Sequence, residues 1–327
     1  MEADTTGPVA GAAPRELRDE AATARGLVLA LGDLNVDELI WLDSPAPPPP
    51  GGEAAVRQVC RRIGGSAANF ARVLARLGVP VALAAATGRD EEGNAAAQWL
   101  SRSGVDSRLV QQDPQLPTGH VRILVDKQGE RTMLCQRGAG AALRWTAELE
   151  QALRGASWLH VSGYAFLGGE TESTARQALA LAQELGIPVS LDPGAMAAAS
   201  PAFAGKILGF LAYAAFAFPN ESEAAALQQA EKRGKLWVEA LAPGGWAFIK
   251  QGTLPCRLEA AAGGRPSLEV PLPLPPVAAE NSTGAGDAFA AGAVAALLHG
   301  WPVDEAAVTG HLTAAWWLGE GAAQGGL

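Results

Sequence analysis

Cysteine and histidine are scarce in this sequence. Its 327 residues include three cysteines, Cys60, Cys135 and Cys256, which lie far apart and form no C-x-x-C pair. An odd number of scattered cysteines argues against a disulfide framework and favours reduced thiols in a cytoplasmic compartment. The four histidines have no spacing typical of metal ligands, so no zinc site is expected.

Positive charge is also in short supply. Lys and Arg total 25 against 34 Asp and Glu, which gives a net charge of −9. Such a field repels polyanions, so nucleic acid is not an expected partner, and a bound anion needs a local helix N-terminus or metal ion. Long apolar runs are missing too. The most apolar stretch, residues 207–218, is well short of the roughly 20 residues that a membrane span requires, so no membrane association is expected.

The pattern along the chain indicates one α/β domain after an N-terminal tail. Residues 1–26 carry acids and no apolar core of a secretory signal, so a disordered or loosely docked tail is expected. From Leu27 onward, short apolar runs alternate with helical spacing. The segment after Gly65, for example, has Ser66 as a plausible N-cap and an apolar stripe that ends before Gly78. This alternation predicts a doubly wound, mostly parallel sheet with helices on both faces, over residues 27–327.

Two segments depart from that alternation, at about residues 38–62 and 118–136. In the second, Val121, Ile123 and Val125 alternate with polar residues and precede a turn and a second alternating run. Period-two alternation around a turn is typical of a β-hairpin. The two segments therefore predict a small β-sheet inserted outside the main sheet.

The strongest chemical signal lies near the C-terminus, where Asn-Ser-Thr precedes Gly284, Ala285 and Gly286 and a small-residue helix follows. Main-chain N–H groups at such a helix start bind phosphate. Asp287 would repel phosphate, unless it takes a proton from the group that attacks the phosphorus atom. The structural alternative is an acid that complements the helix dipole.

A second constellation lies in the amino-terminal half. Asn35 and Asp37 follow the first predicted strand, and Gly64, Gly65 and Asn69 surround the start of the next helix. We expect them at the carboxyl edge of the sheet, where α/β proteins bind ligands. Amide and carboxylate groups suit a sugar, because they satisfy both hydroxyl donors and acceptors. The alternative is simply a turn followed by a helix start.

A third pair, Asn220 and Glu223, lies between an apolar strand and an Ala-rich helix. The spacing predicts a capping box, which by itself explains both residues. Next to a phosphate site, the same pair could instead organise Mg²⁺ and nucleotide phosphates, since Mg²⁺ prefers oxygen ligands and keeps several waters.

Together these segments resemble the PfkB, or ribokinase-like, family of carbohydrate kinases over residues 27–324. The likeness rests on G-D-x-N-x-D at 32–37, G-G-S-A-A-N-F-A at 64–71, G-R-D-x-x-G at 88–93, D-x-x-G-E-R-T at 126–132, N-x-x-E at 220–223 and T-G-A-G-D-A-F at 283–289. Each motif is weak alone, and the ordered set is specific. The resemblance implies a ribokinase-like fold, a small β-sheet that acts as a lid, and a cytoplasmic, ATP- and Mg²⁺-dependent sugar kinase.

The resemblance also implies a role for each motif residue. Asp287 would be the general base, and the N–H groups of Gly284, Ala285 and Gly286 would stabilise the transferred phosphoryl group. The expected sugar contacts are Asn35, Asp37, Gly64, Gly65 and Asn69; the expected nucleotide contacts are Asn220, Thr283, Pro243 and Gly245; and the expected metal residue is Glu223. Further substrate candidates are Tyr164, Arg131 and Arg137. In several relatives the lid also forms a homodimer interface.

The chain departs from the family pattern at two places. Asn281 stands where the family usually has an aspartate, which argues against potassium activation. Ala240 and Ala242 precede Pro243, where a hydroxyl contact to nucleotide is usual. Two alternatives therefore stay open: a nucleoside kinase on the same fold, and a non-catalytic sugar-binding or regulatory homologue.

Overall fold

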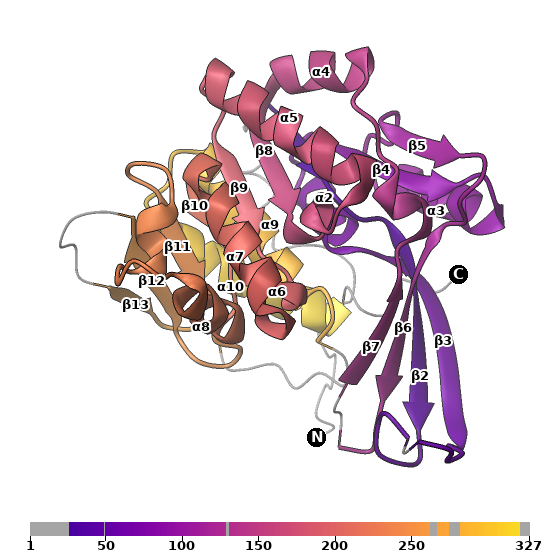
Figure 1. Cartoon of the computed structure of the whole chain (residues 1–327). Coiled ribbons are helices and arrows are strands. Elements are labelled where there is room, and N and C mark those ends of the chain that lie inside the picture. Colours follow the sequence, from indigo (N-terminus) through magenta and orange to yellow (C-terminus); the bar gives the residue numbers. More distant parts are fainter. Residues whose placement is uncertain (1–25, 49, 129–130, 262–266, 275–281, 321–327) are drawn as a thin grey trace, which may run out of the picture.

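The computed structural model describes residues 26–48, 50–128, 131–261, 267–274 and 282–320 (Figure 1). The predicted N-terminal tail lies outside the described residues, apart from Gly26. The strands are β1 (Leu27–Leu31), β2 (Asn35–Leu42), β3 (Val56–Gly64), β4 (Val81–Gly88), β5 (Val110–Asp113), β6 (Gly119–Val125), β7 (Arg131–Gln136), β8 (Ala156–Ser162), β9 (Val189–Asp192), β10 (Phe216–Ala217), β11 (Trp246–Ile249), β12 (Cys256–Ala260) and β13 (Leu268–Val270). The α-helices are α2 (Ser66–Arg76), α3 (Glu91–Arg102), α4 (Ala147–Arg154), α5 (Gly169–Leu185), α6 (Ala195–Ala199), α7 (Pro201–Phe210), α8 (Glu221–Ala230), α9 (Ala285–Leu298) and α10 (Val303–Glu320).

The main sheet confirms the predicted doubly wound architecture. Within the described residues it has nine strands in the order β13-β12-β11-β10-β9-β8-β1-β4-β5. The pairs from β11 across to β5 are parallel, and β12 and β13 add antiparallel pairs at one edge. Parallel strands buried on both faces require continuous apolar sequence, and β4 is buried along its whole length.

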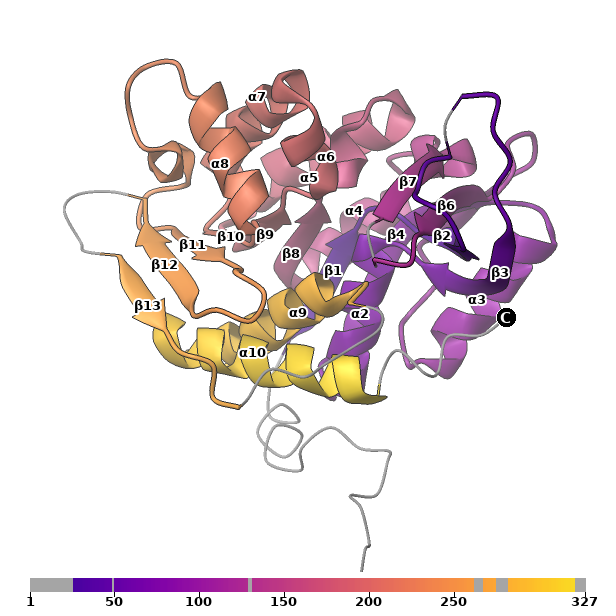
Figure 2. The same ribbon diagram turned by 90° about the horizontal axis from the view of Figure 1, so that it is seen from below.

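Helices cover both faces of this sheet and form two separate apolar cores. One core joins the sheet to α2, α3, α9 and α10, and the other joins it to α4, α5, α6, α7 and α8. Figure 2 shows α9 and α10 on the face opposite α7 and α8. Within the described residues, no helix combines the length and apolar character needed to span a membrane.

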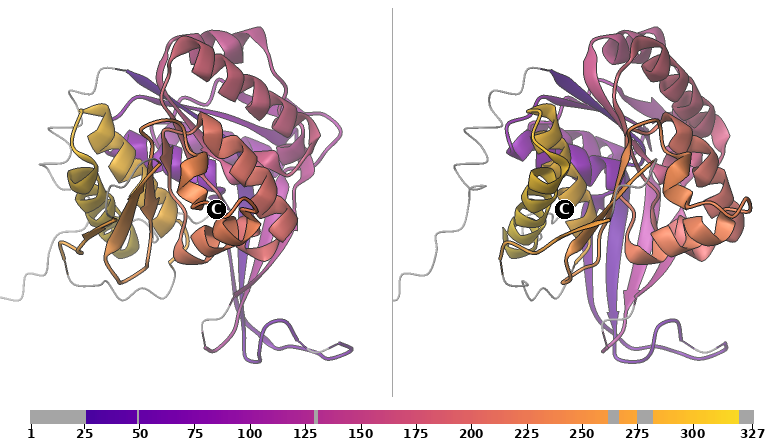
Figure 3. Two further views of the ribbon diagram at one scale, coloured as in Figure 1. Left: turned by 60° about the vertical axis from the view of Figure 1, so that its left-hand side comes forward. Right: turned by 90° about the vertical axis from the view of Figure 1, so that its left-hand side faces the viewer.

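A second sheet projects from the main body (Figures 1 and 3). In the part of the chain that the structure describes, its four strands run β3-β2-β6-β7. The predicted hairpin is confirmed, because β6 and β7 pair antiparallel from His120↔Gln136 to Val125↔Arg131. Strand β2 links this hairpin to β3, because it pairs antiparallel with β3 and parallel with β6.

This sheet begins earlier than expected, and that corrects the location of two predicted residues. Asn35 and Asp37 belong to β2 of the small sheet and not to the carboxyl edge of the main sheet. The cause is the short link Gly32-Asp33-Leu34 after β1, which turns the chain directly into the second sheet. Both residues nevertheless lie near the carboxyl edge of the main sheet, because they line one cavity together with Asp192, the last residue of β9.

Candidate active site

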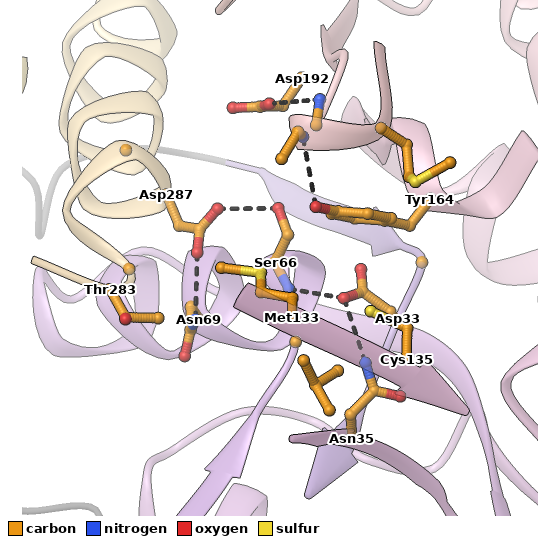
Figure 4. A pocket seen from close by; sticks show the side chains of 18 of the residues that line it. Asp33, Asn35, Ser66, Asn69, Met133, Cys135, Tyr164, Asp192, Thr283 and Asp287 are labelled. Carbon is orange, nitrogen blue, oxygen red and sulfur yellow. Dashed lines mark hydrogen bonds between the residues drawn. The ribbon is translucent and has the colours of Figure 1, made fainter. Parts of the chain in front are cut away.

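One cavity of about 470 Å³ lies where the small sheet, the carboxyl ends of the main strands and the start of α9 meet. Figure 4 shows the side chains that enter it from these elements. The cavity brings together most of the predicted site residues: Asn35, Asp37, Gly65, Asn69, Asn220, Glu223, Thr283, Gly284, Ala285, Gly286 and Asp287. Segments separated by more than 200 residues therefore meet at a single site.

Three predicted residues do not line this cavity. Gly64 lies directly behind Asp37, where a Cβ atom would come within 2.5 Å of the carboxylate carbon, so Gly64 leaves room for Asp37. Pro243 and Gly245 lie in the turn before β11, where the Gly245 N–H donates to the Ala242 carbonyl at 2.8 Å. Asn281 lies outside the described residues.

Asp287 occupies the first turn of α9, whose N-cap Gly284 has a left-handed φ of 83°. Its carboxylate accepts hydrogen bonds from Ser66 Oγ at 2.7 Å and from Asn69 Nδ2 at 3.0 Å, both on α2 (Figure 4). Desolvation by the surrounding protein, together with the charge of Asp192, raises the pKa of Asp287 to about 8. A carboxylate tuned to near-neutral pH is suited to accept a proton from a substrate hydroxyl.

This raised pKa makes a prediction about stability. Between the ordinary value of 3.8 and about 8, the folded protein keeps a proton that the unfolded chain releases, so this contribution to stability is lost as pH rises. We therefore expect the Tm of Asp287→Asn, relative to wild type, to increase from pH 4 to pH 8 and then to level off. Thermal unfolding across that range measures it. A pH-independent difference would contradict the assigned desolvation.

The start of α2 corrects another expectation, because Ser66 is not its N-cap. The cap position is Gly65, with φ 109°, and a Cβ there would come within 2.5 Å of the Asp33 carbonyl oxygen. Asp33 supplies the missing acceptor from the end of β1: its carboxylate accepts from the Ser66 N–H at 2.8 Å and from Ser162 Oγ at 2.9 Å. Capping from a distant strand leaves the Ser66 hydroxyl available to Asp287.

We expect Asp33→Ala to lower the free energy of unfolding by about 1–3 kcal/mol, because it leaves those donors without their acceptor. Asp33→Asn retains one acceptor oxygen and should lose less. Urea denaturation of the two variants measures both effects. Equal stability of Asp33→Ala and wild type would contradict the capping role.

Asp37 is the second carboxylate with a shifted pKa. Its side chain is 8% exposed and lies 3.9 Å from Arg62 Nε on the neighbouring strand β3. Burial raises the pKa of Asp37 to about 7, although the Arg62 charge opposes the shift. Asp37, at the base of the small sheet, would be a strong hydrogen-bond acceptor for the hydroxyl groups of a ligand in the cavity.

The roof of the cavity is largely apolar. Val121 and Ile123 of β6 and Met133 and Cys135 of β7 point inward from the small sheet, on the same face as Asp37. Across the cavity, Tyr164 accepts a hydrogen bond from the Ala195 N–H at 3.2 Å (Figure 4).

The two arginine candidates make contacts within the protein. Arg137 lines the cavity, but its guanidinium donates to three main-chain carbonyls, those of Gly168, Gly140 and Tyr164. Arg131 is not among the lining residues; its Nη1 donates to Thr283 Oγ1 at 3.0 Å and so links β7 to the turn before α9.

Asn220 and Glu223 form the predicted capping box at the start of α8. Asn220 Oδ1 accepts from the Glu223 N–H at 2.9 Å, and Glu223 Oε2 accepts from the Asn220 N–H at 2.8 Å. Burial and the charge of Asp192 raise the pKa of Glu223 to about 7. Both side chains also line the cavity, so the cap holds oxygen atoms in place there. An all-oxygen donor set of this kind fits Mg²⁺.

Sequence reasoning missed three further residues at the site. Lys250 follows β11 and donates from Nζ to Asp192 Oδ2, at the end of β9, over 2.7 Å. Ser66 binds Asp287. The available signals were the polar residues that end the apolar runs V-S-L-D and A-F-I-K, since the carboxyl ends of parallel strands share one edge.

The fold and this cavity define a class of protein: an α/β protein with a glycine-rich helix start, a buried acid with a raised pKa in the first turn of that helix, and a small second sheet beside the site. The sequence model of the "pfkB family carbohydrate kinase" group matches residues 27–327. The chain belongs to this family.

Curated relatives and solved structures agree with that assignment. The chain is 30% identical to an "ATP-dependent ribose-1-phosphate kinase" of Halopiger xanaduensis, over 85% of this chain and 87% of the relative. It is 30% identical to a fructokinase of Klebsiella pneumoniae, over 89% and 91%. Among structures, an adenosine kinase from Sinorhizobium meliloti superposes with a TM-score of 0.74 at 20% identity, over 90% and 94% of the two chains. An E. coli "putative Ribokinase II in complex with ATP and Mg+2" gives 0.72 at 20% identity, over 89% and 92%. At such identities the structures establish the ribokinase-like fold.

Proposed function

We propose that this protein is an ATP-dependent kinase that transfers the γ-phosphoryl group of Mg-ATP to a hydroxyl of a small carbohydrate. The observation that carries the proposal is the position of Asp287: a carboxylate with a raised pKa, beside the main-chain N–H groups at the start of α9 and facing the cavity. The names of the full-length relatives, a ribose-1-phosphate kinase and a fructokinase, favour the same reaction.

In the proposed mechanism, Asn35, Asp37, Gly65 and Asn69 hold the acceptor, and Asp287 takes the proton of the attacking hydroxyl. The N–H groups of residues 284–286 bind the oxygens of the phosphoryl group as it moves, which stabilises the charge that develops in the transition state. Ser66 and Asn69 orient Asp287 by their hydrogen bonds. Thr283 and Asn220 are the proposed nucleotide contacts. Pro243 and Gly245 are not among them, because they precede β11 and so lie at the amino end of a strand whose carboxyl end faces the cavity.

Glu223, with Asn220, is the proposed holder of Mg²⁺, which when bound would neutralise charge on the nucleotide phosphates. Burial and the charge of Asp192 raise the pKa of Glu223, and a cation bound beside this carboxyl group would favour its ionised form. Asn281 offers an amide instead of a carboxylate, so we propose activity without potassium.

We propose that the small sheet is the lid that closes over the acceptor. Closure excludes water, which would otherwise compete with the acceptor for the phosphoryl group. The outer face of this sheet carries Val59 and Leu134 at 52% and 53% exposure. These two side chains lie on the edge strands β3 and β7, with the ion-paired Glu38, Arg61 and Arg122 between them on the same face. The two edge strands are the basis on which we propose a homodimer through the lid. We also propose that the protein works in the cytoplasm, because it would use ATP and because Cys60, Cys135 and Cys256 are free thiols.

The test is ADP release from Mg-ATP with a panel of pentoses, hexoses, sugar phosphates and nucleosides, with and without potassium. We expect one acceptor class to give strong turnover that does not depend on potassium. Sugar binding with neither nucleotide binding nor turnover would favour a non-catalytic sugar-binding homologue and would contradict the proposed activity.

A nucleoside kinase is the second candidate, and the apolar roof favours it. Val121, Ile123 and Met133 would pack against a base better than against a hydroxyl-rich sugar. A relative named "Nucleoside kinase" from Methanothermobacter thermautotrophicus is 30% identical over 51% of this chain and 52% of the relative. Turnover with nucleosides and none with free sugars would select this candidate.

A further inference from the structure

Arg72 is a buried arginine on α2 whose neighbours are aromatic. The residue is 5% exposed. Its guanidinium carbon lies 5.0 Å from the ring centre of Trp99 on α3 and 5.1 Å from that of Trp317 on α10. The face of an indole ring attracts a cation, so the two tryptophans stabilise this guanidinium where a carboxylate is the more usual partner of a buried arginine.

Trp317 in turn packs against the turn that opens α9. Its Nε1–H donates to the Thr283 carbonyl at 3.0 Å. A Cβ atom built on Gly284 would lie 2.9 Å from Trp317 Nε1 and 3.0 Å from Cζ2, so the indole touches the main chain at the N-cap of α9. Gly284 has a φ of 83° there, a conformation that glycine adopts readily and other residues rarely. The indole therefore helps to set the position of the turn whose N–H groups we propose for phosphoryl binding.

One helix, α2, supports both parts of the proposed phosphoryl site. Ser66 and Asn69 hold the carboxylate of Asp287 by hydrogen bonds. Arg72 follows Asn69 by three residues, a spacing that places side chains next to one another on a helix. The helices α2, α9 and α10 pack on the same face of the main sheet (Figure 2). The acid and the turn are thus positioned, relative to one another, by adjacent side chains of α2.

The charge of Arg72 needs an explanation beyond packing. Desolvation and two neighbouring arginines, Arg76 and Arg62, lower its pKa to about 10, so the guanidinium stays charged at neutral pH. Burial of a charge is unfavourable, and an apolar side chain that only filled the space between the helices would avoid that penalty. The contact that requires the charge is the one with the two indole rings.

We propose that Arg72 is a positioning residue: it holds Trp317 against Thr283 and Gly284, and so fixes the N–H groups of residues 284–286 for the transition state. This inference rests on the proposed kinase function. Neither Arg72 nor Trp317 lines the cavity, so neither is expected to touch nucleotide or acceptor. The charge that the N–H groups stabilise develops as the phosphoryl group moves. Loss of the support should therefore lower the rate of transfer and leave the affinity for both substrates nearly unchanged.

The test uses three variants and a matched control. Arg72→Met keeps a long stem and removes the charge, whereas Arg72→Lys keeps a cation against the rings. Trp317→Phe keeps an aromatic ring and removes the donor to Thr283. The control is Arg76→Met, which removes a contact of the same kind, to Trp316 at 5.6 Å, one turn further along α2.

Steady-state kinetics measures kcat and both KM values. Calorimetry measures binding of Mg-ADP with and without aluminium fluoride, a mimic of the phosphoryl group in flight. We expect Arg72→Met and Trp317→Phe to lose about 10- to 10²-fold in kcat and in the gain of affinity that fluoride gives, with KM values within about twofold of wild type. Arg72→Lys should recover most of the kcat that methionine loses, and Arg76→Met should match wild type.

The double variant that carries Arg72→Met and Trp317→Phe should lose no more than the weaker of the two single variants, because both changes release the same turn. Losses that multiply would overturn the proposal, as would an equal loss of kcat in Arg76→Met. Should Arg72→Met fail to fold, a wild-type kcat and fluoride gain in Trp317→Phe would overturn it. Wild-type protein that shows neither turnover nor a fluoride-dependent gain would instead overturn the proposed function, and this inference with it.

Discussion

Replacement of Asp287 by asparagine is expected to lower kcat by about 10²- to 10⁴-fold, equivalent to about 3–5 kcal/mol. The amide matches the carboxylate in shape and can still bond to Ser66 or Asn69, whose contacts are 2.7 and 3.0 Å, but it cannot take the hydroxyl proton. Nucleotide and acceptor binding should change little. Steady-state kinetics with the best acceptor measures the loss.

The matched control is Asp304→Asn, which removes an exposed acid from the first turn of α10. If Asp287 only complemented the dipole of α9, both substitutions would lower the free energy of unfolding by the same few tenths of a kcal/mol, and neither would lower kcat. Turnover within about threefold of wild type in Asp287→Asn would remove Asp287 from the role of base.

Replacement of Asp37 by alanine is expected to lower kcat/KM for the acceptor by about 10- to 10²-fold, since a hydrogen bond to a charged acceptor contributes about 1.5–3 kcal/mol. The carboxylate is buried, 3.9 Å from Arg62, at the base of the small sheet. Affinity for Mg-ADP, which binds at the other end of the cavity in our proposal, should stay within about twofold.

Asp37→Asn tests the same contact while keeping the shape of the side chain, and should lose less than alanine. The control is Asp43→Ala, which removes an exposed aspartate that follows β2 and lies 3.5 Å from Lys127. An acceptor kcat/KM that falls equally in the Asp43 variant would show a general effect on the small sheet. Unchanged acceptor kinetics in both Asp37 variants would contradict the proposed sugar contact.

The sequence predicted the parts of this site that depend on local pattern. The Gly-rich turn before Asp287 and the capping box of Asn220 and Glu223 are both readable within a few residues, and the structure has α9 and α8 starting there. Alternation at Val121, Ile123 and Val125 likewise predicted the hairpin of β6 and β7.

The parts that depend on distant pairing were not predictable in the same way. Ser66 binds Asp287, which lies 221 residues further along the chain. Asp33 caps α2, and the strands β2 and β3 of the small sheet lie between them in the sequence. Lys250 follows the apolar strand β11, and only the order of the strands in the sheet brings it beside Asp192. Local spacing indicates where an element starts, while the strand order decides which ends meet.

The most direct test of the account is a single-turnover reaction with γ-labelled Mg-ATP and the best acceptor, in wild type and in Asp287→Asn. We predict that wild type transfers the label straight to the acceptor, that no labelled protein accumulates, and that the variant leaves the label on ATP over the same time. Label that passes through a phosphoenzyme, or that appears as inorganic phosphate in place of phosphorylated acceptor, would contradict direct transfer to a hydroxyl deprotonated by Asp287.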